Sequence, residues 1–177
     1  MEIMEKLVDI ILYLIPAAGV VAAVYVILKQ YFENQQKSNE SEWKEKRTKA
    51  YFPMQVQAYE RLILFLERMH PERIVFRLNK PGMSARQLQN EIFKTIRDEF
   101  DHNLTQQLYM SVKAWELVKS AKADTLEIVK VAAEQVDKNA DSFAFSAAIL
   151  ETVSKLKRAP SDIAVDYLKA EFRKKME

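Results

Sequence analysis

The two histidines of this 177-residue chain stand in the same short motif, in which a glutamate precedes a histidine by three residues. The first motif holds Glu67 and His70, and the second holds Glu99 and His102. Two such pairs on facing helices of a bundle, together with two further glutamates, would build a carboxylate-bridged di-iron or di-manganese site. The motifs therefore raise the hypothesis of a di-metal enzyme.

A second interpretation explains the same histidines as residues at helix ends. His70 directly precedes Pro71, so it lies in the last turn of a helix or just beyond it. A histidine in such a position stabilises the terminal carbonyl groups of the helix. Glu67 also falls toward the edge of the apolar stripe that contains Leu62 and Leu66. We favour this interpretation, and we expect no metal, no cofactor and no catalytic residue.

The stretch around the second motif, DEFDHNLTQQLYMS at residues 98–111, is rich in polar side chains. It connects two predicted helices, and backbone groups released at helix ends need hydrogen-bond partners. The polar side chains that can supply them are Asp101, His102, Asn103, Gln106 and Gln107. The larger side chains Leu104, Leu108 and Tyr109 are expected to dock into the core. The same stretch could equally form a surface that binds a partner.

The composition excludes several other kinds of site. The chain has no cysteine, which excludes disulfides, cysteine-based metal sites and cysteine nucleophiles. It contains no glycine-rich phosphate loop and no nucleophile elbow. A formal net charge of +2 gives no reason to expect binding of nucleic acid. No motif points to a small-molecule substrate.

The elements that must position these residues are predicted to be helices. Only two glycines and five prolines are present, and helix-favouring residues dominate. Residues 53–70 carry an apolar stripe at helical spacing, made up of Tyr59, Leu62, Leu66 and Met69. Further helices are expected at residues 84–101 and 111–136, from Asp141 or Ser142 to residue 156, and from residue 160 onward. Residues 74–78 are expected to form an extended connection. The predicted fold class is all-α, with a bundle of about five helices.

An uncharged apolar run at residues 10–28 is long enough, as a helix, to cross the hydrocarbon core of a bilayer. One lysine precedes this run, and most of the nearby basic residues follow it. The positive-inside rule then places the N-terminus outside and the rest of the chain in the cytoplasm, as in a single-pass protein of the bacterial inner membrane. The expected domains are a transmembrane anchor at residues 1–29, a polar stalk or linker at residues 30–52, and a cytoplasmic helical domain at residues 53–177.

One face of this predicted span consists of small residues. Ala18 and Ala22 are four residues apart, as are Gly19 and Ala23. Such spacing lets a second helix approach closely within a bilayer. These four residues are therefore the candidate contact with an integral membrane protein complex.

Three stretches carry a resemblance to a known family: AYERLILFLER, RDEFDHNLTQQLYMS and KAWELVKSAK. Together they resemble an uncharacterised family of single-span inner-membrane proteins of Bacteroidota, over most of the chain. The most specific part is EFDHNLTQQLYMS, residues 99–111. The resemblance implies a cytoplasmic helical domain on an N-terminal anchor, and it brings no activity and no catalytic residues.

The leading functional hypothesis is a non-enzymatic accessory or adaptor subunit of a larger inner-membrane complex. The bundle would dock on a protein partner, and translocation or secretion machinery is one host that fits. One alternative is a homo-oligomeric membrane scaffold. The other is the di-metal carboxylate enzyme built from Glu67, His70, Glu99 and His102.

Overall fold

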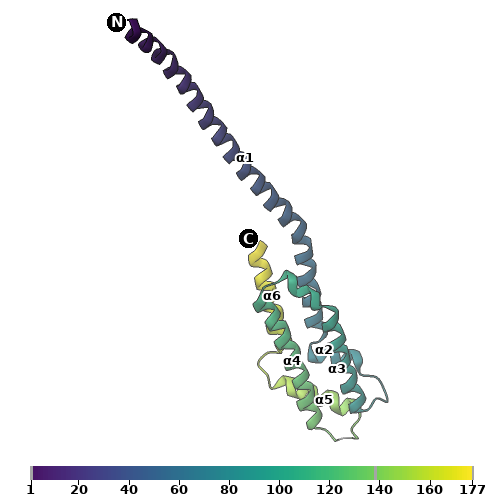
Figure 1. The fold of residues 1–177 in the computed structure, drawn as a ribbon. Coiled ribbons are helices and arrows are strands. Elements are labelled where there is room, and N and C mark those ends of the chain that lie inside the picture. Colours follow the sequence, from purple (N-terminus) through teal and green to yellow (C-terminus); the bar gives the residue numbers. More distant parts are fainter. Residues whose placement is uncertain (1, 138, 177) are drawn as a thin grey trace. The chain divides into compact units, whose positions relative to one another are not determined.

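The structure is a computed structural model. It describes the backbone of residues 2–137 and 139–176, and the side chains of residues 19–20, 24–36, 42–43, 46–137 and 139–176. Within these residues the chain is all-helical, which confirms the predicted fold class (Figure 1). The chain divides into two compact units, Met1–Tyr51 and Phe52–Glu177.

The first unit consists of the larger part of α1, which runs over Glu2–Arg68. The backbone is helical throughout residues 30–52, the segment predicted to be a stalk or a linker. Pro53, predicted to begin a helix, instead lies within α1. Of the four small residues predicted to contact a partner helix, Ala18, Ala22 and Ala23 lie outside the described side chains. Gly19 is exposed, and a Cβ atom added there would meet nothing within 4 Å.

The predicted membrane location is contradicted. Among the described residues, we find no helix that combines the length and the apolar character needed to cross a membrane. A spanning helix needs about 20 mainly apolar residues in one run. The predicted span at residues 10–28 lies largely outside the described side chains. This finding also contradicts the predicted single-pass topology, with the N-terminus outside and the C-terminal domain in the cytoplasm.

The second unit is a helical bundle. It contains the end of α1, followed by α2 (Pro71–Leu78), α3 (Ala85–His102), the 3-10 helix η1 (Leu104–Tyr109), α4 (Val112–Glu134), α5 (Ser142–Ser154) and α6 (Pro160–Met176). Within it, α4 packs against α5 and α6, whereas α3 packs against α2, α4 and α5 (Figure 1). The starts and ends of α3, α4 and α5 and the start of α6 agree with the predicted helices to within about two residues, the usual uncertainty of helix boundaries.

The prediction that residues 74–78 form an extended connection is wrong, because these residues form the end of α2. Pro71 occupies the first helical turn, where its missing N–H costs nothing. The helix then buries Ile74 and Val75 against the bundle. Packing of this buried face outweighs the β-propensity of the branched residues, because such propensity depends strongly on context. The described part of the bundle therefore contains one more α-helix than the periodicity indicated.

The apolar stripes read from the sequence form the core of the second unit. The residues that recur at alternating spacings of four and three along α4 are all buried, the polar Thr125 among them: Ala114, Val118, Ala121, Thr125, Ile128 and Ala132. Tyr59, Leu62 and Leu66 of α1, and Met69 directly after it, are at most 2% exposed. A regular 3.6-residue period therefore located the core correctly.

Local hydrogen bonds fix where the helices begin. Ser84 caps α3 in a reciprocal capping box with Gln87. Asp141 caps α5 through the backbone N–H of Ala144 at 2.8 Å. The backbone of Ala85 donates to Ala140, and that of Ser142 donates to Met83, each at 2.9 Å, so the two helix starts are joined. Before them, Gly82 takes a φ of +81° in the Pro81-Gly82 turn, a conformation that favours glycine.

Candidate functional site

Three of the four residues of the di-metal hypothesis, Glu67, His70 and Glu99, lie in ion pairs with other residues. The Glu99 carboxylate lies 2.9 Å from Arg68 and 3.2 Å from Arg77, so it joins α3 to α1 and α2. The Glu67 carboxylate accepts a hydrogen bond from Arg73. In the part of the chain that is described, no three His, Cys, Asp or Glu side chains gather in a group able to hold a metal ion. The geometry therefore gives the di-metal alternative no support.

The two histidines lie in different surroundings. The Nε2 atom of His70 lies 3.7 Å from Asp162 at the start of α6, and the His70 side chain is largely covered. His102 is exposed at the last residue of α3. Both therefore lie at helix ends, where the second interpretation of the sequence placed them.

The junction between α3 and α4 is more exposed than the sequence suggested. Asn103 donates from Nδ2 to the backbone carbonyl of Glu99 at 2.7 Å, where α3 ends. Asp101, His102 and Gln107 lie on the surface, and Gln106 is partly covered. The expectation that Leu104 and Leu108 dock into the core is wrong, because they are 39% and 70% exposed. These two side chains are presented by η1, whose residues are all outside the core.

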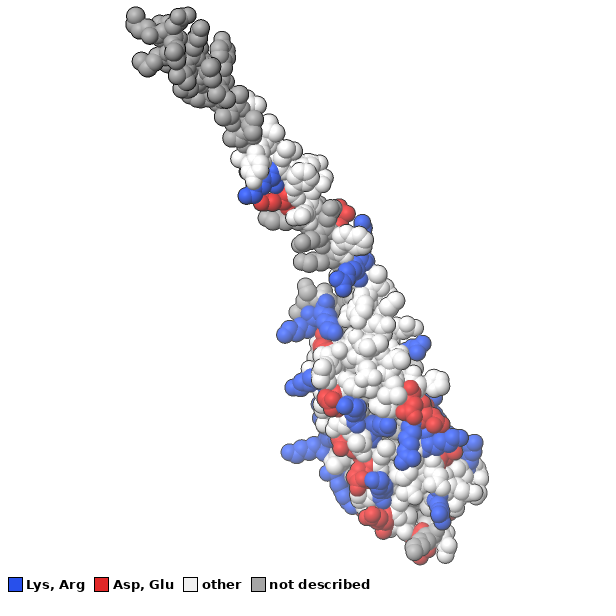
Figure 2. Space-filling model, viewed as in Figure 1, with Lys and Arg blue, Asp and Glu red and all other residues white. Residues whose placement is uncertain are grey.

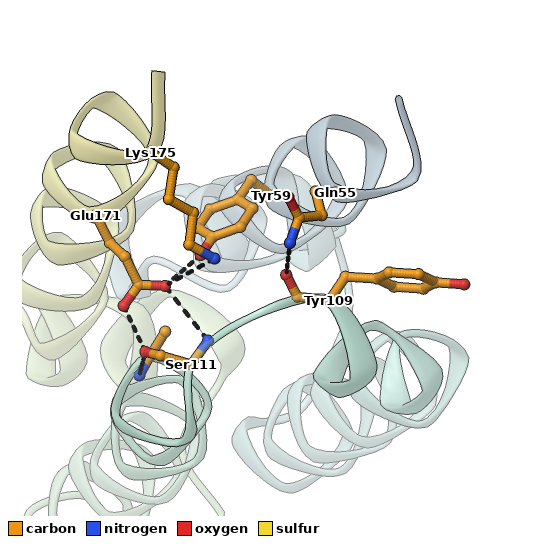
Figure 3. A network of polar contacts seen from close by, with 7 residues as sticks. Gln55, Tyr59, Tyr109, Ser111, Glu171 and Lys175 are labelled. Atoms are coloured by element: carbon orange, nitrogen blue, oxygen red, sulfur yellow. Dashed lines mark hydrogen bonds and ion pairs between the residues drawn. The ribbon is translucent and has the colours of Figure 1, made fainter. Parts of the chain in front are cut away.

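The polar network that joins the helices near this junction centres on Glu171 of α6 (Figure 3). Its carboxylate accepts hydrogen bonds from the Tyr59 hydroxyl of α1 and from the Ser111 hydroxyl at the start of α4. The Ser111 backbone N–H also points to it at 3.4 Å, and the Lys175 ammonium lies 3.8 Å away. One carboxylate therefore connects α1, α4 and α6.

This environment shifts the pKa values of Glu171 and Tyr59. Burial acts to raise the pKa of Glu171, but the hydrogen bonds from Ser111 and Tyr59 and the charge of Lys175 outweigh it and lower that pKa. Burial, followed by the hydrogen bond to Glu171, raises the pKa of the Tyr59 hydroxyl well above its usual range. At neutral pH the carboxylate therefore stays charged and Tyr59 stays a donor. The network is suited to holding helices together, not to moving protons.

Glu171 was not among the residues predicted from the sequence to be functional. A signal was present, because Ser161, Ala164 and Leu168 form the buried stripe of α6, and Glu171 continues its spacing of three or four residues. A charged residue that continues a buried stripe needs a partner inside the protein. Ser111, Tyr59 and Lys175 are those partners.

Two surface hollows of the second unit could receive a ligand or a partner. The first, here called the α1–α3 hollow, has a volume of about 380 Å³. It is lined by Arg61, Leu64, Phe65, Arg68, Asp98, Glu99, His102 and Asn103. It therefore includes the part of the junction stretch that ends α3. Its walls carry charges of both signs.

The second, here called the α2–α5 hollow, has a volume of about 370 Å³. It is lined by Val75, Phe76, Asn79, Lys80, Pro81, Phe143, Ser146, Ala147 and Leu150. Phe76 is 75% exposed and Phe143 is 64% exposed, although both are large aromatic side chains. The Asn79 amide donates to the Ser146 hydroxyl at 3.1 Å, whereas its buried Oδ1 atom has no hydrogen-bond partner among the described residues. Neither phenylalanine was singled out from the sequence.

The comparison with known families gives a match over nearly the whole chain. The model of DUF7935, a family of unknown function, matches residues 5–175. The chain belongs to this family. As a DUF7935 member it fits the uncharacterised family that the three quoted stretches resembled, and the match includes both hollows and the Glu171 network. No curated protein and no solved structure matched the chain.

Proposed function

We propose that this DUF7935 member is a non-enzymatic adaptor whose helical bundle binds a protein partner at the α2–α5 hollow. The observation that carries the proposal is the exposure of Phe76 and Phe143 at the rim of one apolar hollow. Burial of a phenylalanine side chain contributes about 1.5–3 kcal/mol, so leaving two of them in water has a cost. Phenylalanine is enriched at protein–protein interfaces, where this cost is recovered.

The surroundings of the two phenylalanines indicate the chemistry of the partner. Val75 and Leu150 supply an apolar floor, which fits an apolar side chain. The unsatisfied Oδ1 atom of Asn79 would accept one hydrogen bond, and a backbone N–H of the partner fits that need. Lys80 adds an exposed cation at the rim. We therefore expect a partner segment with an apolar anchor residue and a nearby acidic residue.

The remaining surface of the bundle does not suggest a charged ligand. Figure 2 shows lysine and arginine side chains interspersed with aspartate and glutamate over the visible face of the second unit. Several of these charges pair along a helix, such as Lys119 with Glu116 at 2.7 Å. Mixed, locally paired charges attract neither a polyanion nor a polycation strongly. An apolar contact at the α2–α5 hollow therefore suits this surface better than an electrostatic one.

The test is site-specific photo-crosslinking of the full-length chain in the cells that produce it. A photoreactive side chain replaces Phe76 or Phe143 in turn, and the same group replaces Ile163 of α6, an exposed apolar position outside the hollow, as the matched control. The expected result is one predominant protein crosslinked from positions 76 and 143, and not from 163. The captured protein is identified by mass spectrometry and purified.

Direct binding then decides the proposal. Phe76→Ala and Phe143→Ala are each expected to weaken binding of the purified partner by about tenfold or more, whereas Ile163→Ala leaves it unchanged. Crosslinking at all three positions alike, or equal binding by all variants, would reject the α2–α5 hollow as the docking site.

We also propose that the chain comes from Bacteroidota and that residues 99–111 are the signature of the family. A position-by-position comparison of DUF7935 members would test both. If the signature is a docking surface in its own right, its exposed positions should vary as little as the buried ones.

A further inference from the structure

The α1–α3 hollow carries one free charge of each sign. Arg61 and Asp98 both line it and are both exposed. Within the described part of the chain, neither of them forms an ion pair, whereas Arg68 and Glu99 beside them are paired with each other. The hollow therefore offers a partner one cation and one anion that are not yet engaged.

The apolar part of the hollow also has two complementary features, a recess and a protruding side chain. Arg61, Leu64, Phe65 and Arg68 are spaced so that they share one face of α1. Phe65 is buried and forms the floor, while Leu64 is 57% exposed beside it. The surface thus has an apolar recess and, next to it, an apolar side chain that stands out from the same helix.

We propose that this surface binds a second copy of the same chain, related to the first by a two-fold axis. In a two-fold interface the same patch faces itself, so residue i meets residue j while j meets i. Arg61 of each copy pairs with Asp98 of the other, and Leu64 of each copy enters the opposite recess. A second copy satisfies both free charges at once, whereas a partner of a single charge would leave one of them without an ion pair.

The inference is independent of the proposed function, because the two hollows share no lining residue. Dimerisation would nevertheless affect how the proposed adaptor binds its partner. A dimer would present two α2–α5 hollows, and a partner with two matching segments would then bind more tightly than either segment alone.

The test uses charge reversal in two variants of the full-length chain, Arg61→Asp and Asp98→Arg. In a homodimer of the first variant, the acidic positions 61 and 98 of the two copies face each other. In a homodimer of the second variant, both facing positions are basic. Each variant by itself is expected to raise the dimer dissociation constant about tenfold or more. A one-to-one mixture of the two is expected to restore dimerisation, because both facing pairs are then of opposite charge. Sedimentation equilibrium and light scattering measure the mass in each case.

The control is Lys169→Asp, which reverses an exposed charge on α6 outside both hollows and should leave the dissociation constant unchanged. Leu64→Gln is expected to weaken dimerisation without changing any charge. Thermal melting establishes that each variant is folded. A wild-type chain that stays monomeric overturns the proposal. So does a dimer that both charge variants retain, or a mixture that fails to dimerise when the wild type does.

Discussion

At the scale of single residues, Glu171 keeps a charge in a largely covered position. It is a carboxylate with 14% of its side chain exposed, yet it stays charged because Tyr59, Ser111 and Lys175 surround it. Hydrogen bonds to a charged group contribute about 1.5–3 kcal/mol each, about twice as much as those between neutral groups. These hydrogen bonds therefore offset the free-energy cost of desolvating the carboxylate only while all the donors are in place.

We expect Glu171→Gln to lower the free energy of unfolding at pH 7 by about 1–3 kcal/mol. The folded state lowers the pKa of this carboxyl, so its contribution is complete above the ordinary glutamate value of about 4.3. It is lost as the pH falls through the lower folded value. Urea unfolding from pH 7 to pH 3 should therefore show the difference between wild type and variant shrinking with acidity.

Glu116→Gln is the matched control for this measurement, because Glu116 is an exposed glutamate paired with Lys119. It should change stability by less than about 1 kcal/mol at any pH. A difference between wild type and Glu171→Gln that does not depend on pH would mean that the carboxylate charge is not what stabilises the network.

At the scale of elements, the helix starts show how one side chain can serve two helices. Ser84 caps α3 by accepting the Gln87 N–H at 3.2 Å. Ser111 caps α4 by accepting the Ala114 N–H at 3.0 Å, and its hydroxyl also donates to Glu171 of α6. The second serine therefore fixes the start of one helix and the position of another, as Figure 3 illustrates.

This difference predicts unequal costs for the same substitution. Ser84→Ala removes a cap and should lower the free energy of unfolding by about 1 kcal/mol. Ser111→Ala removes a cap and also a donor to a charged group, so we expect a loss of about 2–3 kcal/mol. Thermal or urea unfolding of the two variants measures both values. Equal losses would show that the bond from Ser111 to Glu171 contributes nothing beyond the cap.

The short helix α2, which was not predicted, depends on its packing against the bundle. Its eight residues, Pro71–Leu78, are too few to be stable alone, since short isolated helices are marginal in water. They form a helix because Ile74 and Val75 are covered by the bundle, and α2 packs against α3 and α5. As a result Phe76 is exposed and lines the same hollow as Phe143 of α5. The α2–α5 hollow therefore exists only because residues 74–78 are helical.

At the scale of the whole second unit, the two hollows lie on different elements and share no residue. Energetic effects of changes at separated sites without shared partners usually add. The two proposed interactions are therefore expected to be independent of each other. An adaptor of this kind would pair with its own copy through one surface and hold its partner through another.

We accordingly expect Phe76→Ala to leave the dimer dissociation constant unchanged, and Arg61→Asp to leave the affinity for an isolated, single-site partner segment unchanged. The two measurements, sedimentation and direct binding, are made on the same two variants. If Arg61→Asp weakened single-site binding as much as Phe76→Ala, the hollows would be coupled, and two separate surfaces would be the wrong description.

The sequence by itself determined the helical class, the approximate bounds of α3, α4 and α5, and the buried stripe near the end of α1. These follow from interactions between residues close in the chain, where a period of 3.6 and the capping side chains are read directly. The tertiary structure alone decided that α2 is a helix, that Leu104 and Leu108 are exposed, and that Glu171 meets Tyr59 and Ser111. These depend on contacts between residues far apart in the chain, and local periodicity carries no information about which distant side chains will cover a given residue.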